Sequence, residues 1–241
     1  KNKSMPRFLE FVPTAPDSSL LYIGQYDPLL VAFSVLAATF AAYTALLVAQ
    51  RVGATAASRE RRLWIAVGGA TMGAGIWAMH FVGMLAFSLP CSTTYDPVIT
   101  LISMIPGVLA STLAIAMISR PALSPSQLGV GGLLLGVGIG CMHYMGMAAY
   151  RMDGFIRYNA ALFIVSLVVA VALATLALWI RFRLRTGHAH WLSSPLLLSA
   201  LVMGLAISGM HYTAMAAAYF VRDDSAGVAA ASMAPGFLAA V

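Results

Sequence analysis

Long apolar stretches alternate with short polar segments along almost the whole of this chain. Because a helix needs about 20 residues to cross a hydrocarbon core about 30 Å thick, each such stretch predicts one membrane-spanning helix. Six stretches are long enough: 28–50, 63–88, 98–118, 126–150, 159–180 and 195–221. A seventh, 225–241, starts like a span but stops at the end of the sequence. The pattern therefore predicts an all-α integral membrane protein, a seven-helix bundle whose last helix is truncated.

Capping residues followed by proline mark the start of several predicted spans. An Asp or Ser side chain accepts hydrogen bonds from the first turn, and proline fits the first helical position because no intrahelical bond is lost there. These pairs are Asp27-Pro28, Asp96-Pro97, Ser124-Pro125 and Ser194-Pro195. Pro106 lies within the third stretch and predicts a kink, since its ring displaces the preceding turn.

The composition excludes most other classes of protein. Of the 241 residues, 61% are hydrophobic and 9% are charged, whereas a soluble domain carries about 25% charged residues. A soluble globule, a fibrous protein and a disordered chain are therefore excluded. The net charge of +6 comes from short basic runs without interleaved aromatic residues, so no nucleic-acid partner is predicted. The only lysines, Lys1 and Lys3, lie at the start of the chain, which excludes a retinal Schiff base.

The arginines predict the orientation, because cytoplasmic loops carry an excess of basic residues. One side of the predicted bundle carries eight of them: Arg51, Arg59, Arg61, Arg62, Arg120, Arg181, Arg183 and Arg185. The opposite side carries three, diluted by four aspartates: Arg151, Arg157 and Arg222. We therefore expect a multi-pass protein of the bacterial cytoplasmic membrane, with the N-terminus outside and the C-terminus in the cytoplasm. We expect residues 1–25 to be a polar, loosely ordered extension and residues 26–241 to form the membrane domain.

A short motif recurs on every second predicted span. Residues 79–84 read MHFVGM, 142–147 read MHYMGM and 210–215 read MHYTAM. The histidines lie 63 and 68 residues apart, so each repeat is one pair of helices that crosses the membrane and returns. A glycine seven residues before each histidine predicts a close approach between helices. These glycines are Gly73, Gly136 and Gly204.

His80, His143 and His211 are expected at one depth in the membrane. Each lies 16 to 18 residues from the start of its span, and a helix rises about 1.5 Å per residue. The three spans run in the same direction, so the rings reach one level in the outer half of the bilayer. Polar side chains at such depth are costly and commonly functional. The alternative is that each histidine only bonds a neighbouring helix.

A methionine follows each histidine by four residues, which places it on the same helix face. These are Met84, Met147 and Met215. Imidazole binds copper, zinc and iron, whereas a thioether selects soft Cu(I). All eight acidic residues lie in the tail or loops, so no carboxylate favours a harder metal. The pattern predicts a copper site, favoured over zinc or haem, although the methionines fit plain packing equally well.

Neighbours of the histidines carry further predictions. Tyr144 and Tyr212 can orient an imidazole or donate to a bound gas, and Phe81 in the first copy can do neither. Cys141 is a candidate thiolate ligand, although a buried cysteine acting as a small hydrophobic residue is favoured. Its pairing with Cys91 depends on geometry that the sequence does not give.

The three Met-His-[Tyr/Phe]-x-[Gly/Ala]-Met copies on alternate spans resemble the MHYT domain, a bacterial integral-membrane sensor module. The resemblance extends over residues 26–241 and includes Ala-Tyr-Thr-Ala-Leu at 42–46 and Gly-Ile-Trp-Ala-Met-His at 75–80. Two positions depart from the motif. Phe81 replaces its tyrosine in the first copy, which puts a direct role for that tyrosine in doubt there. Ala214 replaces its glycine in the third copy and relaxes the argument for close packing.

The resemblance implies a function as well as a fold. It implies that His80, His143 and His211, with Met84, Met147 and Met215, bind copper and thereby sense oxygen, carbon monoxide, nitric oxide or redox state. It also implies fused cytoplasmic diguanylate cyclase (GGDEF) and phosphodiesterase (EAL) domains that control cyclic di-GMP. No such output domain lies within this sequence, so the chain itself is not expected to be an enzyme. The expected partners are the lipid bilayer, the gas and the output domains, and a homodimer stays open.

Histidines within a membrane also occur in two other classes of protein. A haem-binding membrane protein for electron transfer needs histidines in pairs on opposing helices. A copper transport protein needs ligands staggered through the membrane. Three single histidines at one level fit a sensor better than either.

Overall fold

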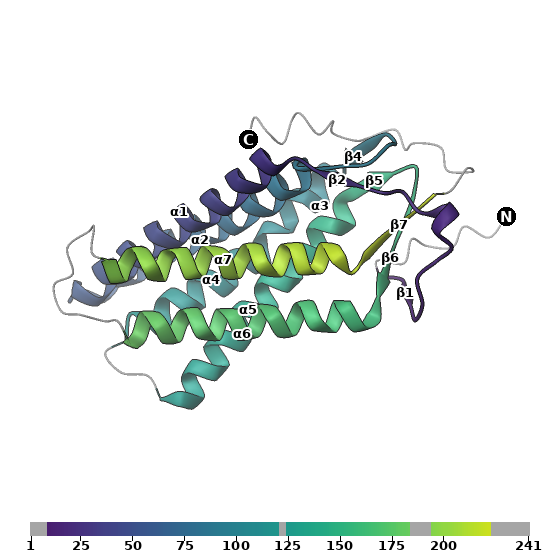
Figure 1. Ribbon diagram of the computed structural model, residues 1–241. Helices are drawn as coiled ribbons and strands as arrows, with labels where there is room; N and C mark the ends of the chain where they lie inside the picture. The colour runs from purple at the N-terminus through teal and green to yellow at the C-terminus, as the bar shows by residue number, and fades with distance from the viewer. Residues whose placement is uncertain (1–8, 121–123, 184–193, 223–241) are drawn as a thin grey trace.

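The computed structural model describes residues 9–120, 124–183 and 194–222, a bundle of long helices with short strands at one end (Figure 1). The helices are α1 (Pro28–Ala54), α2 (Ser58–Leu85), α3 (Pro97–Ile102), α4 (Met104–Ile118), α5 (Pro125–Ala149), α6 (Ala160–Arg183) and α7 (Ser194–Ala216). Counting α3 and α4 as one, six helical segments within the described residues are long and apolar enough to cross a membrane. The predicted all-α membrane bundle is confirmed. The expected seventh span, 225–241, lies outside the described residues.

Three of the predicted capping residues begin helices as expected, whereas the second span begins at Ser58 rather than at residue 63 and has no side-chain cap. The Asp27 carboxylate accepts hydrogen bonds from the first backbone N–H groups of α1, and Asp96 does the same for α3. Ser124 forms a reciprocal capping box with Gln127 at the start of α5. Asp27, Asp96 and Ser124 each precede a proline at the first helical position, where the missing N–H costs no intrahelical bond.

The third predicted span is interrupted at Ser103, close to the predicted kink. α3 ends at Ile102 and α4 begins at Met104, with Ser103 between them. Pro106 explains the position of the break, because a proline ring clashes with the carbonyl group four residues earlier, which belongs to Ile102. The Ser103 hydroxyl donates to the Thr100 carbonyl oxygen at 2.7 Å and satisfies one group at the break.

The membrane-crossing segments form a closed ring in which each packs against the next and α7 packs against α1. The helices α2, α5 and α7 contact one another and are the more buried, inner set, whereas α1, α4 and α6 form the more exposed, outer set. Glycines permit the close approaches that the sequence predicts. A Cβ at Gly73 would lie 2.5 Å from the Cα of Val108 in α4, and one at Gly136 would lie 2.6 Å from the Cα of Val171 in α6. Gly204 makes the third such contact, with α1.

Matching buried residues of the inner helices follow one another at intervals of four positions. Met72, Leu135 and Met203 form the first layer. The second layer is Ile76, Ile139 and Ile207. The third is His80, His143 and His211, and the fourth is Met84, Met147 and Met215. The imidazoles are therefore enclosed between apolar side chains on both sides along the bundle.

Short strands close each repeat at the end nearest the histidines. β2 (Gln25–Tyr26) pairs with β3 (Phe87–Ser88), β4 (Thr93–Tyr95) with β5 (Tyr150–Met152), and β6 (Gly154–Asn159) with β7 (Ala218–Arg222), all antiparallel. Each repeat is thus a strand, an outer helix, an inner helix and a strand. The inner helices end at Leu85, Ala149 and Ala216, before the predicted ends of the spans at residues 88, 150 and 221. The difference arises because a short apolar strand continues the hydrophobic pattern of the helix before it.

The described part of the N-terminal extension is not loosely ordered, contrary to the sequence prediction. β1 (Phe11–Val12) pairs in parallel with β6. The backbone N–H of Tyr22 donates to the carbonyl oxygen of Phe220 at 2.9 Å, and Glu10 lies 3.3 Å from Arg157 in an ion pair. These partners are distant in sequence, which is why local composition did not reveal the pairing.

Candidate metal centre

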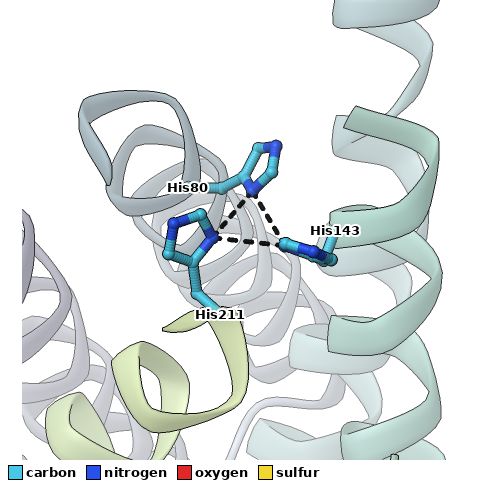
Figure 2. Close-up of side chains that lie close together, drawn as sticks. All are labelled: His80, His143 and His211. Carbon is cyan, nitrogen blue, oxygen red and sulfur yellow. Dashed lines mark hydrogen bonds between the residues drawn. The ribbon is translucent and has the colours of Figure 1, made fainter. Parts of the chain in front are cut away.

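Three imidazole rings converge at the centre of the bundle. His80 of α2, His143 of α5 and His211 of α7 are each at most 1% exposed. Their Nδ1 atoms are 3.1 Å apart for His80 and His211, 3.1 Å for His80 and His143, and 3.2 Å for His143 and His211 (Figure 2). Within the described residues, these three histidines form the one group of side chains that could hold a metal ion. The group contains no carboxylate or thiolate.

The size of the nitrogen triangle fits a metal ion. A point equidistant from three atoms about 3.1 Å apart lies about 1.8 Å from each, close to the imidazole–metal distance of about 2.0–2.1 Å, so the three nitrogens could hold one ion. The three neutral imidazoles together offer three ligand atoms, one nitrogen from each ring. Neutral imidazoles carry no negative charge, so no side chain of this layer would balance the charge of a bound cation.

Protons alone cannot satisfy this triangle. The Nδ1 of a neutral imidazole is either a donor or an acceptor, never both. Among three such atoms at least two are therefore alike, so two lone pairs or two N–H groups face each other at 3.1–3.2 Å. A cation that accepts all three lone pairs removes this conflict. The donor set thus fits a metal, and its binding by these residues stays a prediction.

The predicted methionines lie in one buried cluster beside the triangle. Met84, Met147 and Met215 pack with aromatic residues on the side of the strands, and the full cluster is Phe81, Met84, Tyr95, Met147, Tyr150, Met215 and Phe220. The methionines that directly precede the histidines belong instead to the larger core of the bundle, as expected from their different helix face. The thioether layer is therefore adjacent to the imidazole layer, and ligation by it stays a prediction.

Both sequence interpretations of Cys141 are wrong. Its side chain is exposed on α5, so it is neither a thiolate ligand of the triangle nor a buried hydrophobic residue. It lies two positions before His143, which turns it to another face of the helix. Cys91 and Cys141 are both free.

The motif tyrosines bond serines of the outer helices. The Tyr144 hydroxyl lies 2.6 Å from the Ser166 hydroxyl of α6, and Tyr212 lies 2.8 Å from Ser34 of α1. Each serine already donates to the carbonyl oxygen three residues earlier at 2.7 Å. The tyrosine must therefore be the donor. These hydroxyls join inner to outer helices and are not directed at the nitrogen triangle.

Sequence reasoning missed a third set of repeated residues. Tyr26, Tyr95 and Tyr158 each lie at or next to the end of the strand before an outer helix. Each lies edge-on to the aromatic residue that follows a motif histidine. Their ring centroids are 5.5–5.7 Å from those of Tyr212, Phe81 and Tyr144. The signal was present as Tyr-Asp-Pro at 26–28 and 95–97, and Tyr-Asn-Ala at 158–160.

Comparison with known proteins gives a consistent result. The MHYT family, described as a bacterial signalling protein N-terminal repeat, matches residues 73–131 and 136–194. The chain is 45% identical over 223 residues to the bifunctional diguanylate cyclase/cyclic di-GMP phosphodiesterase MucR of Pseudomonas aeruginosa, covering 91% of this chain and 32% of that protein. It is 38% identical over 210 residues to the cyclic di-GMP phosphodiesterase NbdA of the same organism, covering 87% and 27%.

A third relative comes from a distant bacterium. The signaling protein YkoW of Bacillus subtilis is 35% identical over 199 residues, which are 82% of this chain and 25% of that protein. This chain therefore spans about a third or less of the relatives named here. No solved structure matches it.

Proposed function

Because the chain belongs to the MHYT family of bacterial signalling repeats, we propose that it is the sensor part of a cyclic di-GMP signalling protein and binds copper through His80, His143 and His211. The single observation that carries the proposal is the buried triangle of Nδ1 atoms, which protons cannot satisfy and which has the size of a three-coordinate metal site. The proposed signal is oxygen, carbon monoxide, nitric oxide or a change of redox state.

The neighbouring layers support copper over harder metals. Neutral imidazoles with thioethers close by suit Cu(I), and the acidic residues of the described chain lie outside the cluster. Met84, Met147 and Met215 are the proposed additional ligands on the strand side. When bound, copper supplies a centre that changes oxidation state and accepts a diatomic ligand.

The protein holds the three rings on helices that can transmit a displacement. Each histidine lies on a different inner helix, and each inner helix contacts two outer helices. A shift of one ring against the others must therefore move packed helices rather than a loop. Sensors need a coupling free energy of only about 1–3 kcal/mol between ligand and output states, so a small displacement is sufficient.

The charge distribution supports an output in the cytoplasm. Arg51, Arg61 and Arg120 are among the arginines at the end of the bundle opposite the strands. At the strand end, Arg151 pairs with Asp96 at 3.4 Å and Arg157 with Glu10, so two arginines there are partly neutralised. We therefore propose that the strand end faces outward. A reporter that is active only in the periplasm, fused at residue 187, should be inactive, and its activity would contradict this orientation.

A layer of isoleucines argues for a sensor rather than a conduit. Ile76, Ile139 and Ile207 are at most 3% exposed and lie one turn from the histidines, toward the arginine end. A copper path would need metal-binding side chains in that position, and isoleucine has no atom that binds a metal. The triangle is therefore proposed as an end point for the metal.

Elemental analysis tests the proposal. Protein purified in detergent and loaded with Cu(I) is compared with His80→Ala, His143→Ala and His211→Ala variants. The control replaces His188 and His190, the two other histidines of the chain, by alanine. We expect copper in the wild type and the control, and loss of copper in each single variant. Equal copper in all variants, or a haem absorption band in place of copper, would contradict the proposal.

A further inference from the structure

The second ring nitrogen of each motif histidine is buried without a polar partner in the described part of the chain. The Nε2 atoms of His80, His143 and His211 are buried and have no hydrogen-bond partner within the described residues. No directional bond therefore fixes the outer edge of each ring. Its position depends on the space that the neighbouring helix leaves.

That space is provided by a glycine of the next motif. A Cβ at Gly83 of α2 would lie 2.6 Å from Nε2 of His211, and a Cβ at Gly146 of α5 would collide with Nε2 of His80. Both glycines lie three residues after the histidine of their own motif. The contacts are cyclic: the ring of the first copy lies against the second motif, and the ring of the third copy lies against the first.

The third position of this cycle is occupied by alanine. The same order predicts that the ring of His143 lies against α7 at Ala214, the position that corresponds to Gly83 and Gly146. Ala214 carries a methyl group at the position where the first two motifs have glycine. One corner of the triangle is thus built differently from the other two.

We propose that the residue three positions after each motif histidine positions the imidazole of the neighbouring inner helix, and that Ala214 makes His143 the distinct corner. The consequence for metal binding rests on the proposed function. Metal–ligand distances tolerate deviations of only about 0.2 Å. A Cβ in van der Waals conflict displaces a ring by more than that. The geometric assignment itself requires no metal.

The first experiment reads the ring positions in metal-free protein. Histidine rings are labelled with ¹⁵N, their signals are assigned with single His→Asn variants, and Gly83→Ala, Gly146→Ala and Ala214→Gly are compared with wild type. Gly129→Ala is the control, because a Cβ there meets nothing within 4 Å. We expect the largest shift at His211 for Gly83→Ala, at His80 for Gly146→Ala and at His143 for Ala214→Gly. Largest shifts on the histidine of the mutated helix would overturn the assignment.

The second experiment measures Cu(I) affinity by competition with a chromophoric chelator. Gly83→Ala and Gly146→Ala should weaken binding about 10- to 100-fold, as loss of supporting contacts around metal ligands does, and Gly129→Ala should not. The double variant Gly83→Ala/Ala214→Gly keeps one alanine in the cycle and should transfer the distinct corner to His211, which guards against a single variant that fails to fold. Unchanged affinity in both glycine variants would contradict the proposal. A wild type without copper would refute the proposed function, and the ring signals would still decide the positioning role.

Discussion

The hydrogen bond between Tyr144 and Ser166 should measurably join the inner helix α5 to the outer helix α6. Both residues are buried, and their hydroxyl oxygens are 2.6 Å apart. In Tyr144→Phe the serine still donates to the Phe163 carbonyl oxygen, so only one acceptor is left without a partner. The loss is therefore smaller than for a stranded donor. Interhelical hydrogen bonds in membrane proteins average about 0.6 kcal/mol and reach about 1.7, and we expect about 1 kcal/mol here.

The assay is a double-mutant cycle on Tyr144→Phe, Ser166→Ala and the double variant. The free energy of unfolding is measured in mixed micelles with increasing SDS, and the coupling free energy isolates the pair. The equivalent cycle on Tyr212 and Ser34 should give a smaller coupling, about 0.5 kcal/mol, because Tyr212 is only half-buried.

The first repeat provides the reverse test. Ser103 follows Phe81 by the same 22 residues that separate Ser166 from Tyr144, and Phe81 has no hydroxyl group. Phe81→Tyr should therefore form the missing bond and raise the free energy of unfolding by up to about 1 kcal/mol. A coupling below about 0.2 kcal/mol for the Tyr144 pair, with no gain in Phe81→Tyr, would refute the reasoning.

Three other variants test separate parts of the structure. Ile76→Ala should lower the free energy of unfolding by about 2–5 kcal/mol, since it opens a cavity in a fully buried layer; a change below about 1 kcal/mol would contradict that packing. At Asp96, hydrogen bonding from the Ile99 N–H, opposed by burial and aided by Arg151, lowers the carboxyl pKa. Because a lowered pKa stabilises the fold above the unfolded-state value, that contribution is lost as the pH falls below about 4, and Asp96→Asn should flatten this acid dependence in SDS unfolding measured against pH. Cys141→Ser should leave copper content unchanged, because the exposed thiol lies away from the triangle; loss of copper would return it to the ligand set.

The sequence was sufficient for the helices and for the three histidines, because both leave local signals. A span needs a long apolar run, and an Asp-Pro or Ser-Pro pair marks its start, as at Asp27 and Ser124. The histidines lie at similar distances, 16 to 18 residues, from the predicted starts of their spans, which predicts similar depth. That the rings face one another follows only from the closed ring of helices, which no local pattern encodes.

The remaining features depend on partners far apart in the chain. Tyr95 and Tyr150 read as helix ends or loop residues, yet they pair across two strands. Cys141 lies beside a motif histidine in sequence, but helix rotation turns it outward. The contact of Gly83 with His211 joins residues from the first and third repeats, and the glycine alone gave no indication of which ring it accommodates.

The contact between α7 and α1 has a consequence for how such a chain can vary. Each repeat meets the next through equivalent surfaces, and this contact brings the third back to the first, so the arrangement has the rotational order of a trimer. Three separate two-helix subunits could make the same contacts without being joined. In such a trimer every substitution would appear at all three corners at once. Joining the subunits in one polypeptide lets a single corner change alone, and Phe81 and Ala214 are two such changes.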